Sequence, residues 1–473
     1  MNRRTWLPGT AGLFRAVPFL LLFVAVLSGA QESGVPVKTG LSVEAAVSLA
    51  LGTDGRIGGA LLDFEASKAK VTEAERRRIP SLSISASYTR LSKVDSSITL
   101  GPLGTMSIDS PEDAFAFTAN LQYPVFAGFR LRESVRLAEL QSMGKELAAQ
   151  TIRNAVAFET RRAYWETARA GRNVEMLQEN LSLMERNRDV VKQRVAQGTV
   201  LKADLLSAQA RCDQAEMDLD DAEDARERAY LNLEALVSAS GGADGKAPVG
   251  TAASRFTLTS KPEDPPLDGR IAEIVSDGND VSPLLREALG SRPETKAAIL
   301  SEEIAGVGKK LAEAPLYPVL SVNGNLTYAN PNSRVYFQAT SAFTGTWNVG
   351  VALSYDLGGL PANLVARDAQ EVGIRRSGVD RSRQEELITM DVRDCLLSYK
   401  RAKRDLGFVT KMLEQAKESE RVSAQQVKRG TASDLDLLTV STARLRNEYA
   451  IVNKEIDLQI AAADLRRSVG AGE

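Results

Sequence analysis

Two long stretches of the chain carry apolar residues at spacings that alternate between four and three. A mean spacing of about 3.5 residues is typical of helices that wind around partner helices in a coiled coil. Proline, which costs about 3 kcal/mol in a helix interior, is absent from 125–247 and from 362–473. In the second stretch the apolar positions are Ile388, Val392, Cys395, Tyr399, Ala402, Leu406, Val409, Leu413 and Ala416.

The first stretch repeats the second one 232 residues earlier, which indicates an internal duplication. A charged residue interrupts both series at the same place, Arg188 in the first and Glu420 in the second. The segment that returns after each stretch is also apolar along one side, so we expect two long helical hairpins. The apolar positions of the first stretch are Ala170, Val174, Leu177, Leu181, Met184, Val191 and Val195.

A matching turn follows each stretch. Gly198 and Gly430 are expected to end the two long helices in the left-handed conformation. Thr199 and Thr431, or a residue just after them, are expected to cap the next helix. The equivalent positions are Val195, Gly198, Thr199 and Asp204 in the first turn, and Val427, Gly430, Thr431 and Asp436 in the second.

Four shorter segments alternate apolar residues with Ser, Thr, Asn or Gln, which is the period of a half-buried strand. Each has about ten residues, a length that suits a tilted strand crossing a membrane. The same period fits a strand of a soluble sandwich, so the pattern alone leaves both interpretations open. The segments are 81–91, 115–126, 318–329 and 346–357.

Four strands are too few to close a membrane barrel by themselves, because the smallest single-chain barrels have about eight. An open sheet edge in lipid would leave backbone groups unpaired, at a cost of several kcal/mol each. If the strands cross a membrane, the barrel must therefore be shared between chains, and three chains would supply twelve strands.

The first 30 residues have the pattern of a secretory signal peptide. Arg3 and Arg4 form a positive region, an apolar run extends from Val17 to Leu27, and a small-residue cleavage pattern ends at Ala30. We expect export and cleavage near Ala30. An uncleaved membrane anchor is the alternative, but the run is shorter than the ~20 residues that span a bilayer.

Composition argues against several functions. The chain has no histidine, which removes His-based catalysis and His-ligated metals. Its 59 Lys and Arg against 61 Asp and Glu give a net charge of −2, without the basic excess of a nucleic-acid-binding protein. Cys212 and Cys395 show no metal or redox motif, and we interpret both as small apolar helix residues. We expect no enzymatic activity, cofactor, metal or nucleic-acid partner.

The duplicated order of helix, strand, loop, strand, long helix, turn and return helix resembles the TolC-type outer membrane factors. These are the channel components of Gram-negative efflux and type I secretion machines. The resemblance covers essentially the whole mature chain and includes the two Gly-Thr turns followed by Asp-Leu-Leu. The run 123–129 also resembles the family's strand-to-helix junction, and 355–359 is a poorer second copy of it.

The resemblance implies a mixed, mainly α fold with four transmembrane β-strands per chain. It implies a homotrimer with a twelve-stranded barrel in outer membrane lipid and an α-helical barrel in the periplasm. Substrates would pass through the lumen, driven by an inner-membrane pump that is joined by a periplasmic adaptor. The two turns would contact the adaptor.

By the same resemblance, Asp204 and Asp436 would ring the channel entrance. Capping of the following helices is the alternative interpretation of both aspartates. Thr439 stands where some family members have a second aspartate, so the ring would be thinner here. Ala432 stands where the family often has a polar or basic residue after Gly-Thr, so the gating contacts would differ from those of the family.

This interpretation divides the chain into a signal peptide (1–30), a first repeat (31–238), a linker (239–281) and a second repeat (282–473). The linker would wrap the helical barrel at mid-height. The expected helices are 42–79, 127–196 and 200–238 in the first repeat, and 282–314, 361–429 and 433–470 in the second.

A periplasmic adaptor, or a structural coiled-coil protein without a membrane barrel, is the alternative function. Adaptors carry a single helical hairpin flanked by β-rich modules, whereas this sequence predicts two hairpins. The pattern therefore favours the channel.

Overall fold

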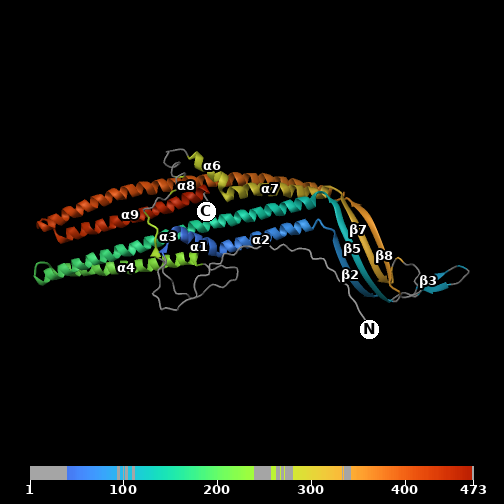
Figure 1. Cartoon of the computed structure of the whole chain (residues 1–473), viewed down its shortest axis with the longest axis horizontal. Helices are drawn as coiled ribbons and strands as arrows, with labels where there is room; N and C mark the ends of the chain where they lie inside the picture. The colour runs from blue at the N-terminus through green and yellow to red at the C-terminus, as the bar shows by residue number, and fades with distance from the viewer. Residues whose placement is uncertain are drawn as a thin grey trace, which may run out of the picture.

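The computed structural model describes residues 40–92, 96–99, 101, 105–108, 112–238, 257–262, 267, 271, 281–332, 334 and 342–470. The signal peptide and most of the linker that the sequence predicts lie outside these residues. The described part is elongated, with an antiparallel sheet at one end and two long helical hairpins extending from it to the other end (Figure 1).

The chain runs twice through the same series of elements. The first repeat consists of α1 (Val43–Thr53), α2 (Gly55–Arg76), β2 (Ser81–Arg90), β5 (Asp113–Ala127), α3 (Arg130–Ala196) and α4 (Lys202–Val237), with β3 (Ser96–Thr99) and β4 (Thr105–Ile108) as a small hairpin between β2 and β5. The second consists of α6 (Ser282–Ser291), α7 (Pro293–Glu313), the short helix η2 (Ala314–Leu316), β7 (Val319–Asn330), β8 (Thr344–Ser354), α8 (Leu360–Lys428) and α9 (Asp434–Val469).

The two single helices expected at 42–79 and 282–314 are each broken in two, so that prediction is wrong. Asp54 ends α1 and caps α2, because its carboxylate accepts a hydrogen bond from the Arg56 backbone N–H at 2.7 Å. Arg292 precedes Pro293, which disfavours the helical conformation at the residue before it, and Arg292 has an extended backbone with ψ 131°.

No helix in the described ranges is both long enough and apolar enough to cross a membrane.

The four long strands form one antiparallel sheet in the order β2-β5-β7-β8, so the strand pair of the first repeat lies beside that of the second and the two pairs join between β5 and β7. Within the described residues, β2 and β8 each have one neighbour only. Both edges of the sheet are therefore open in a single chain.

The sheet has one apolar and one polar face, as the alternation predicts. Leu326 lies opposite Trp347 on the apolar face, where Ile84 and Trp347 are 78% and 72% exposed. On the polar face the side chains of Asn120 and Asn325 share a hydrogen bond of 2.6 Å. In one chain the apolar side is thus open to its surroundings.

The strand-to-helix junction of the first repeat requires a glycine. Gly128 has φ +59°, and a Cβ at this position would lie 2.2 Å from the carbonyl oxygen of Ala314 in η2. Phe126, Phe129 and Tyr317 pack edge to face around the junction, with ring centroids 5.3 to 6.4 Å apart. The end of β5 and the start of α3 are thereby fixed against the second repeat.

The helical body is a layer in which α9 packs against α8 on one side and α3 on the other, with α4 beyond α3 (Figure 1). The predicted 3.5-residue seam of α8 is its buried side, with Ile388, Val392, Cys395 and Tyr399 each at most 6% exposed. Both cysteines are free and buried. Burial raises the pKa of Cys395 to about 12, and the nearby carboxylates of Asp464 and Asp391 further disfavour the thiolate.

Tyr164 of α3 is one of the residues that attach the linker to the helices; Gln459 of α9, which donates to the Pro262 carbonyl at 3.1 Å, is another. Strand β6 (Thr257–Leu258) pairs in parallel with β1 (Gly40–Leu41). The fully buried Tyr164 of α3 donates its hydroxyl to the Leu41 carbonyl at 2.9 Å. The same oxygen accepts hydrogen bonds from the backbone N–H groups of Thr259, at 3.1 Å, and Ser260, at 3.0 Å. Two segments far apart in sequence therefore meet at one side chain.

Candidate functional site at the hairpin tips

The two Gly-Thr turns lie together at the end of the molecule that is far from the sheet (Figure 1). Gly198 and Gly430 both have φ +73°, the left-handed conformation that the sequence predicts. In each turn the threonine N–H bonds to the carbonyl five residues earlier, Thr199 to Arg194 at 3.0 Å and Thr431 to Gln426 at 2.9 Å. This is the Schellman pattern that ends a helix.

The threonine hydroxyls have a different role from the predicted one. Those of Thr199 and Thr431 donate to the same carbonyls as their backbone N–H groups, at 3.0 and 3.1 Å, and so terminate the incoming helices. The residues that begin the next helices are Leu201 and Ser433. Ser433 fits the prediction of a cap just after the threonine, whereas Leu201 has no side-chain acceptor.

Asp204 and Asp436 supply the capping interactions from inside the first turn of α4 and α9. The Asp204 carboxylate accepts from the Leu201 N–H at 3.0 Å. The Asp436 carboxylate accepts from the Ser433 hydroxyl at 2.7 Å and from its N–H at 3.0 Å. These two hydrogen bonds from Ser433 lower the pKa of Asp436. Both aspartates remain exposed, so capping leaves their charges available to solvent.

An ion pair holds the tips of the two hairpins at the same level. Arg194, four residues before Gly198, pairs with Asp434, four residues after Gly430. The repeat equivalents of the two residues are Gln426 and Lys202, so the duplication does not provide a second copy of this pair. Sequence reasoning missed it, although the equal spacing from the two glycines is a signal that could have found it.

Arg444 of α9 joins three helices above the tips. It pairs with Glu420 of α8 at 2.8 Å, with Glu179 of α3 at 3.3 Å, and with Glu448 of its own helix. The charged interruption of the second seam thus has a partner from the returning helix. In the first seam the equivalent Arg188 pairs instead with its neighbour Asp189 at 3.0 Å.

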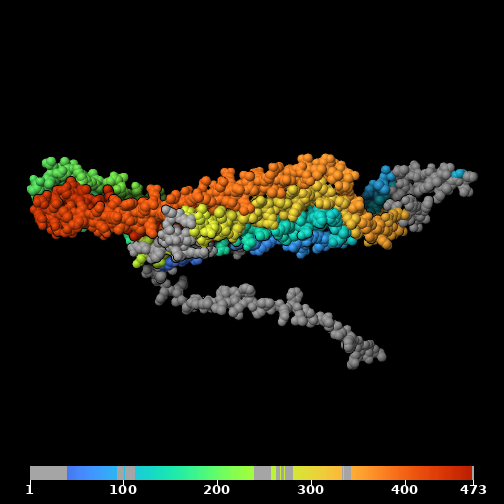
Figure 2. Space-filling model, turned by 90° about the horizontal axis from the view of Figure 1, so that it is seen from above, coloured from blue at the N-terminus to red at the C-terminus, as the bar shows by residue number. Residues whose placement is uncertain are grey.

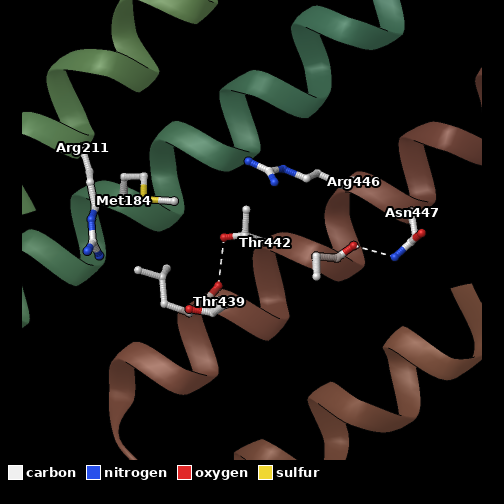
Figure 3. A pocket seen from close by; sticks show the side chains of 8 residues that line it. Met184, Arg211, Thr439, Thr442, Arg446 and Asn447 are labelled. Carbon is white, nitrogen blue, oxygen red and sulfur yellow. Dashed lines mark hydrogen bonds between the residues drawn. The ribbon is translucent and has the colours of Figure 1, made fainter. Parts of the chain in front are cut away.

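A groove of about 480 Å³ opens between the first hairpin and α9 near the tips (Figure 3). Thr439, at the position where the family resemblance suggests an acid, lines it and donates to the Leu435 carbonyl at 2.9 Å. The groove contains two arginines, Arg211 and Arg446, from different hairpins. Its lining residues are Met184, Arg211, Leu438, Thr439, Thr442, Ala443, Arg446 and Asn447.

Across the residues that the structure describes, no three His, Cys, Asp or Glu side chains are grouped so that they could hold a metal ion. The tips present exposed carboxylates, a groove with two arginines, and ion pairs between the hairpins made by Arg194 and by Arg444.

Duplicated hairpins with turns at a common level, together with an apolar-faced sheet at the opposite end, define a TolC-type fold. The model of the outer membrane efflux protein family matches residues 46–239 and 284–471. The chain belongs to this family, which places it in the outer membrane. Among curated proteins, none is significantly similar to the chain in sequence.

Several solved structures share the fold at low sequence identity. The CmeC outer membrane channel of Campylobacter jejuni is 16% identical with a TM-score of 0.71, over 91% of this chain and 86% of that one. The outer membrane protein VceC of Vibrio cholerae is 19% identical with a TM-score of 0.68, over 91% and 96%. The open MtrE channel of Neisseria gonorrhoeae is 17% identical with a TM-score of 0.67, over 93% of each chain.

Proposed function

We propose that this protein is the outer membrane channel of a tripartite efflux pump or a type I secretion system. It would act as a homotrimer and a passive conduit from the periplasm to the exterior. The observation that carries this proposal is the sheet with two open edges and an exposed apolar face. In lipid each unpaired backbone group costs several kcal/mol, so neighbouring copies must pair β8 with β2 to close a barrel of twelve strands.

The helices give the conduit its length. At 1.5 Å per residue, the 69 residues of α8 extend over about 100 Å. A body of this length suits a tube that projects from the membrane into the periplasm, with the tips at its inner end. Export through a signal peptide cleaved near Ala30 is part of this proposal.

At the inner end, Asp204 and Asp436 would form the channel entrance, with six carboxylates in a trimer. A ring of like charge in a narrow lumen favours cations. The turns formed by Val195, Gly198 and Thr199 and by Val427, Gly430 and Thr431 would contact a periplasmic adaptor that links the channel to an inner-membrane pump. The arginines of the groove suit acidic side chains of such a partner.

The proposal is tested by purifying the protein in detergent and inserting it into a planar bilayer. We expect a trimer by native mass spectrometry and discrete conductance steps. A monomer that stays soluble without detergent and gives no conductance would contradict the channel and favour the structural coiled-coil alternative.

The entrance role of the two aspartates is tested separately by the double variant Asp204→Asn with Asp436→Asn. Asparagine keeps an acceptor for the capping bond, so the fold should persist while six charges leave the trimer. We expect block by divalent and trivalent cations to weaken several-fold. Glu386→Gln, an exposed carboxylate of α8 away from the tips, serves as the control and should leave block unchanged. Equal block in all three proteins would limit the aspartates to capping.

A further inference from the structure

The helices α4 and α9 each carry an exposed stripe that begins at the tip aspartate and contains one arginine further from the tip. Arg211 lies seven residues after Asp204, and Arg446 lies ten residues after Asp436. Steps of three and four residues keep side chains on one face of a helix. At 1.5 Å per residue, the two arginines lie about 10 and 15 Å beyond their aspartates. The exposed stripes are Asp204, Ser207, Arg211 and Gln214 on α4, and Asp436, Thr439, Ala443 and Arg446 on α9.

The stripes occupy equivalent positions of the two repeats, but the arginine stands at a different position in each. Shifted by 232 residues, Arg211 corresponds to Ala443 and Gln214 to Arg446. The two arginine positions are thus one helical turn apart on the common pattern. Each repeat supplies one arginine, so a trimer would have six, as many as the carboxylates of the proposed entrance.

Arg211 and Arg446 line one groove although they belong to different hairpins. The groove lies near the end of the body where the first hairpin, in green, meets the second, in red (Figure 2). The two arginines enter it from opposite sides, with Thr442 of α9 between them (Figure 3). Its volume of about 480 Å³ is in the range of sites for small molecules. Two guanidinium groups therefore face a space that a small molecule can fill.

The positive charge of this groove has no counter-charge within the chain. No acid is among its lining residues. Neither Arg211 nor Arg446 has an ion pair or a hydrogen bond among the residues that the structure describes. By contrast Arg444, two residues before Arg446, pairs with three carboxylates. Two uncompensated cations that face one groove create a positive potential, which attracts an anion.

The other groups of the groove define the kind of anion. The hydroxyls of Thr439 and Thr442 already donate to carbonyls of their own helix, at 2.9 and 2.8 Å, so the guanidinium groups are the main donors to a ligand. A guanidinium binds a carboxylate or a phosphate through two parallel N–H bonds. Met184 and Leu438 add apolar surface to the same groove. The groove therefore suits an organic anion, with a carboxylate or phosphate on an apolar body.

We propose that Arg211 and Arg446 bind small organic anions on the wall of the channel, just beyond its acidic entrance. This inference rests on the proposed function, which places Asp204 and Asp436 at the entrance, and it names a class of cargo. Because the arginines share the stripes of these aspartates, they face the same lumen. The stripes lead from the entrance into the channel, which favours cargo over an acidic segment of the adaptor as the occupant. Anionic cargo that passes the carboxylates thus meets a level of opposite charge.

Block of the reconstituted channel by an organic phosphate tests the site. The probe is 1-naphthyl phosphate, added at the tip side of a planar bilayer in about 0.1 M KCl, because higher salt screens exposed charges. We expect Arg211→Gln with Arg446→Gln to raise the concentration for half block at least tenfold, and each single variant to raise it less. Lysine at both positions keeps the charge but loses the paired N–H bonds, so it should give an intermediate value.

Arg186→Gln is the matched control. Arg186 is an exposed arginine of α3, and its distance of two residues from Met184 places it on a different face of the helix. Its loss should leave block by 1-naphthyl phosphate unchanged. Neutral 1-naphthol and inorganic phosphate should both block the original protein more weakly than the ester, because each provides only one part of the contact.

The reversal potential in a KCl gradient provides a second measurement, which does not depend on the choice of probe. In the double glutamine variant six positive charges leave the lumen while six carboxylates remain, so the channel should become more selective for K⁺. Unchanged block together with an unchanged reversal potential would overturn the anion site and leave the arginines to a protein partner. An original protein that gives no conductance would instead contradict the proposed function itself.

Discussion

Replacing Gly128 by alanine is expected to prevent most of the protein from reaching its assembled state. The left-handed backbone at Gly128 costs about 1–2 kcal/mol for a residue with a Cβ. The new Cβ would in addition lie 2.2 Å from the Ala314 carbonyl oxygen, a position that no Cβ can occupy. Ala314 cannot simply move away, because it is 3% exposed and its carbonyl accepts a hydrogen bond from the Tyr317 N–H at 3.2 Å.

The consequence would extend beyond the junction. A shift between β5 and η2 would separate Phe129 from Tyr317 and change the angle at which α3 leaves the sheet. Because the same sheet and helices must meet neighbouring copies, we expect a large loss of trimer yield and a lower unfolding temperature in the residual trimer. Both are measured by heating samples before electrophoresis and by circular dichroism.

Gly171→Ala is the matched control. Gly171 lies within α3, and a Cβ there would meet nothing within 4 Å. Alanine is favoured over glycine in a helix by roughly 0.5–1 kcal/mol, so this variant should be as stable as the original protein or slightly more so. Equal behaviour of the two alanine variants would show that the junction tolerates a side chain.

The seams and strands could be predicted because they repeat. An apolar residue recurs every three or four residues along α8 and every second residue along a strand, so a few irregular residues do not hide the pattern. The helix breaks at Asp54 and Arg292 depend on single local interactions and are absent from the periodic signal. Pro293 is visible in the sequence, but its effect on Arg292 competes with a helical pattern that continues on both sides.

At the tips, the left-handed glycines followed from backbone sterics and were predicted correctly. The capping chemistry was predicted in part: Ser433 and the two aspartates cap as expected, but Thr199 and Thr431 bond to the helices before them, because a threonine in such a turn can satisfy either helix. The three-way pairing of Arg444 depends on where α3, α8 and α9 lie in space, which the spacing of charges within one helix does not reveal.

The attachment of the linker was also beyond the sequence pattern, since Tyr164 bonds to backbone groups rather than to a recognisable side-chain motif. Tyr164→Phe should therefore have a large and local effect. It removes the acceptor of the Ser260 N–H and the hydroxyl bond to Leu41, and each buried group left unpaired costs about 1–3 kcal/mol. In this variant the Thr259 N–H still donates a hydrogen bond to the Leu41 carbonyl at 3.0 Å, so neither of these two groups is left unpaired.

A loss of about 2–4 kcal/mol should release β6 from the helices while the sheet and hairpins stay folded. Hydrogen–deuterium exchange of the amides at 257–260 should accelerate by about two orders of magnitude, since every 1.4 kcal/mol is a factor of about ten. Tyr399→Phe is the control, because Tyr399 is also buried but its hydroxyl has no hydrogen-bond partner among the described residues. If exchange at 257–260 stays slow in Tyr164→Phe, or rises as much in Tyr399→Phe, the linker is held by other contacts. The expected contrast between two buried tyrosines separates the hydroxyl from the ring, and so tests whether hydrogen bonding, rather than packing, fastens the linker to the helical body.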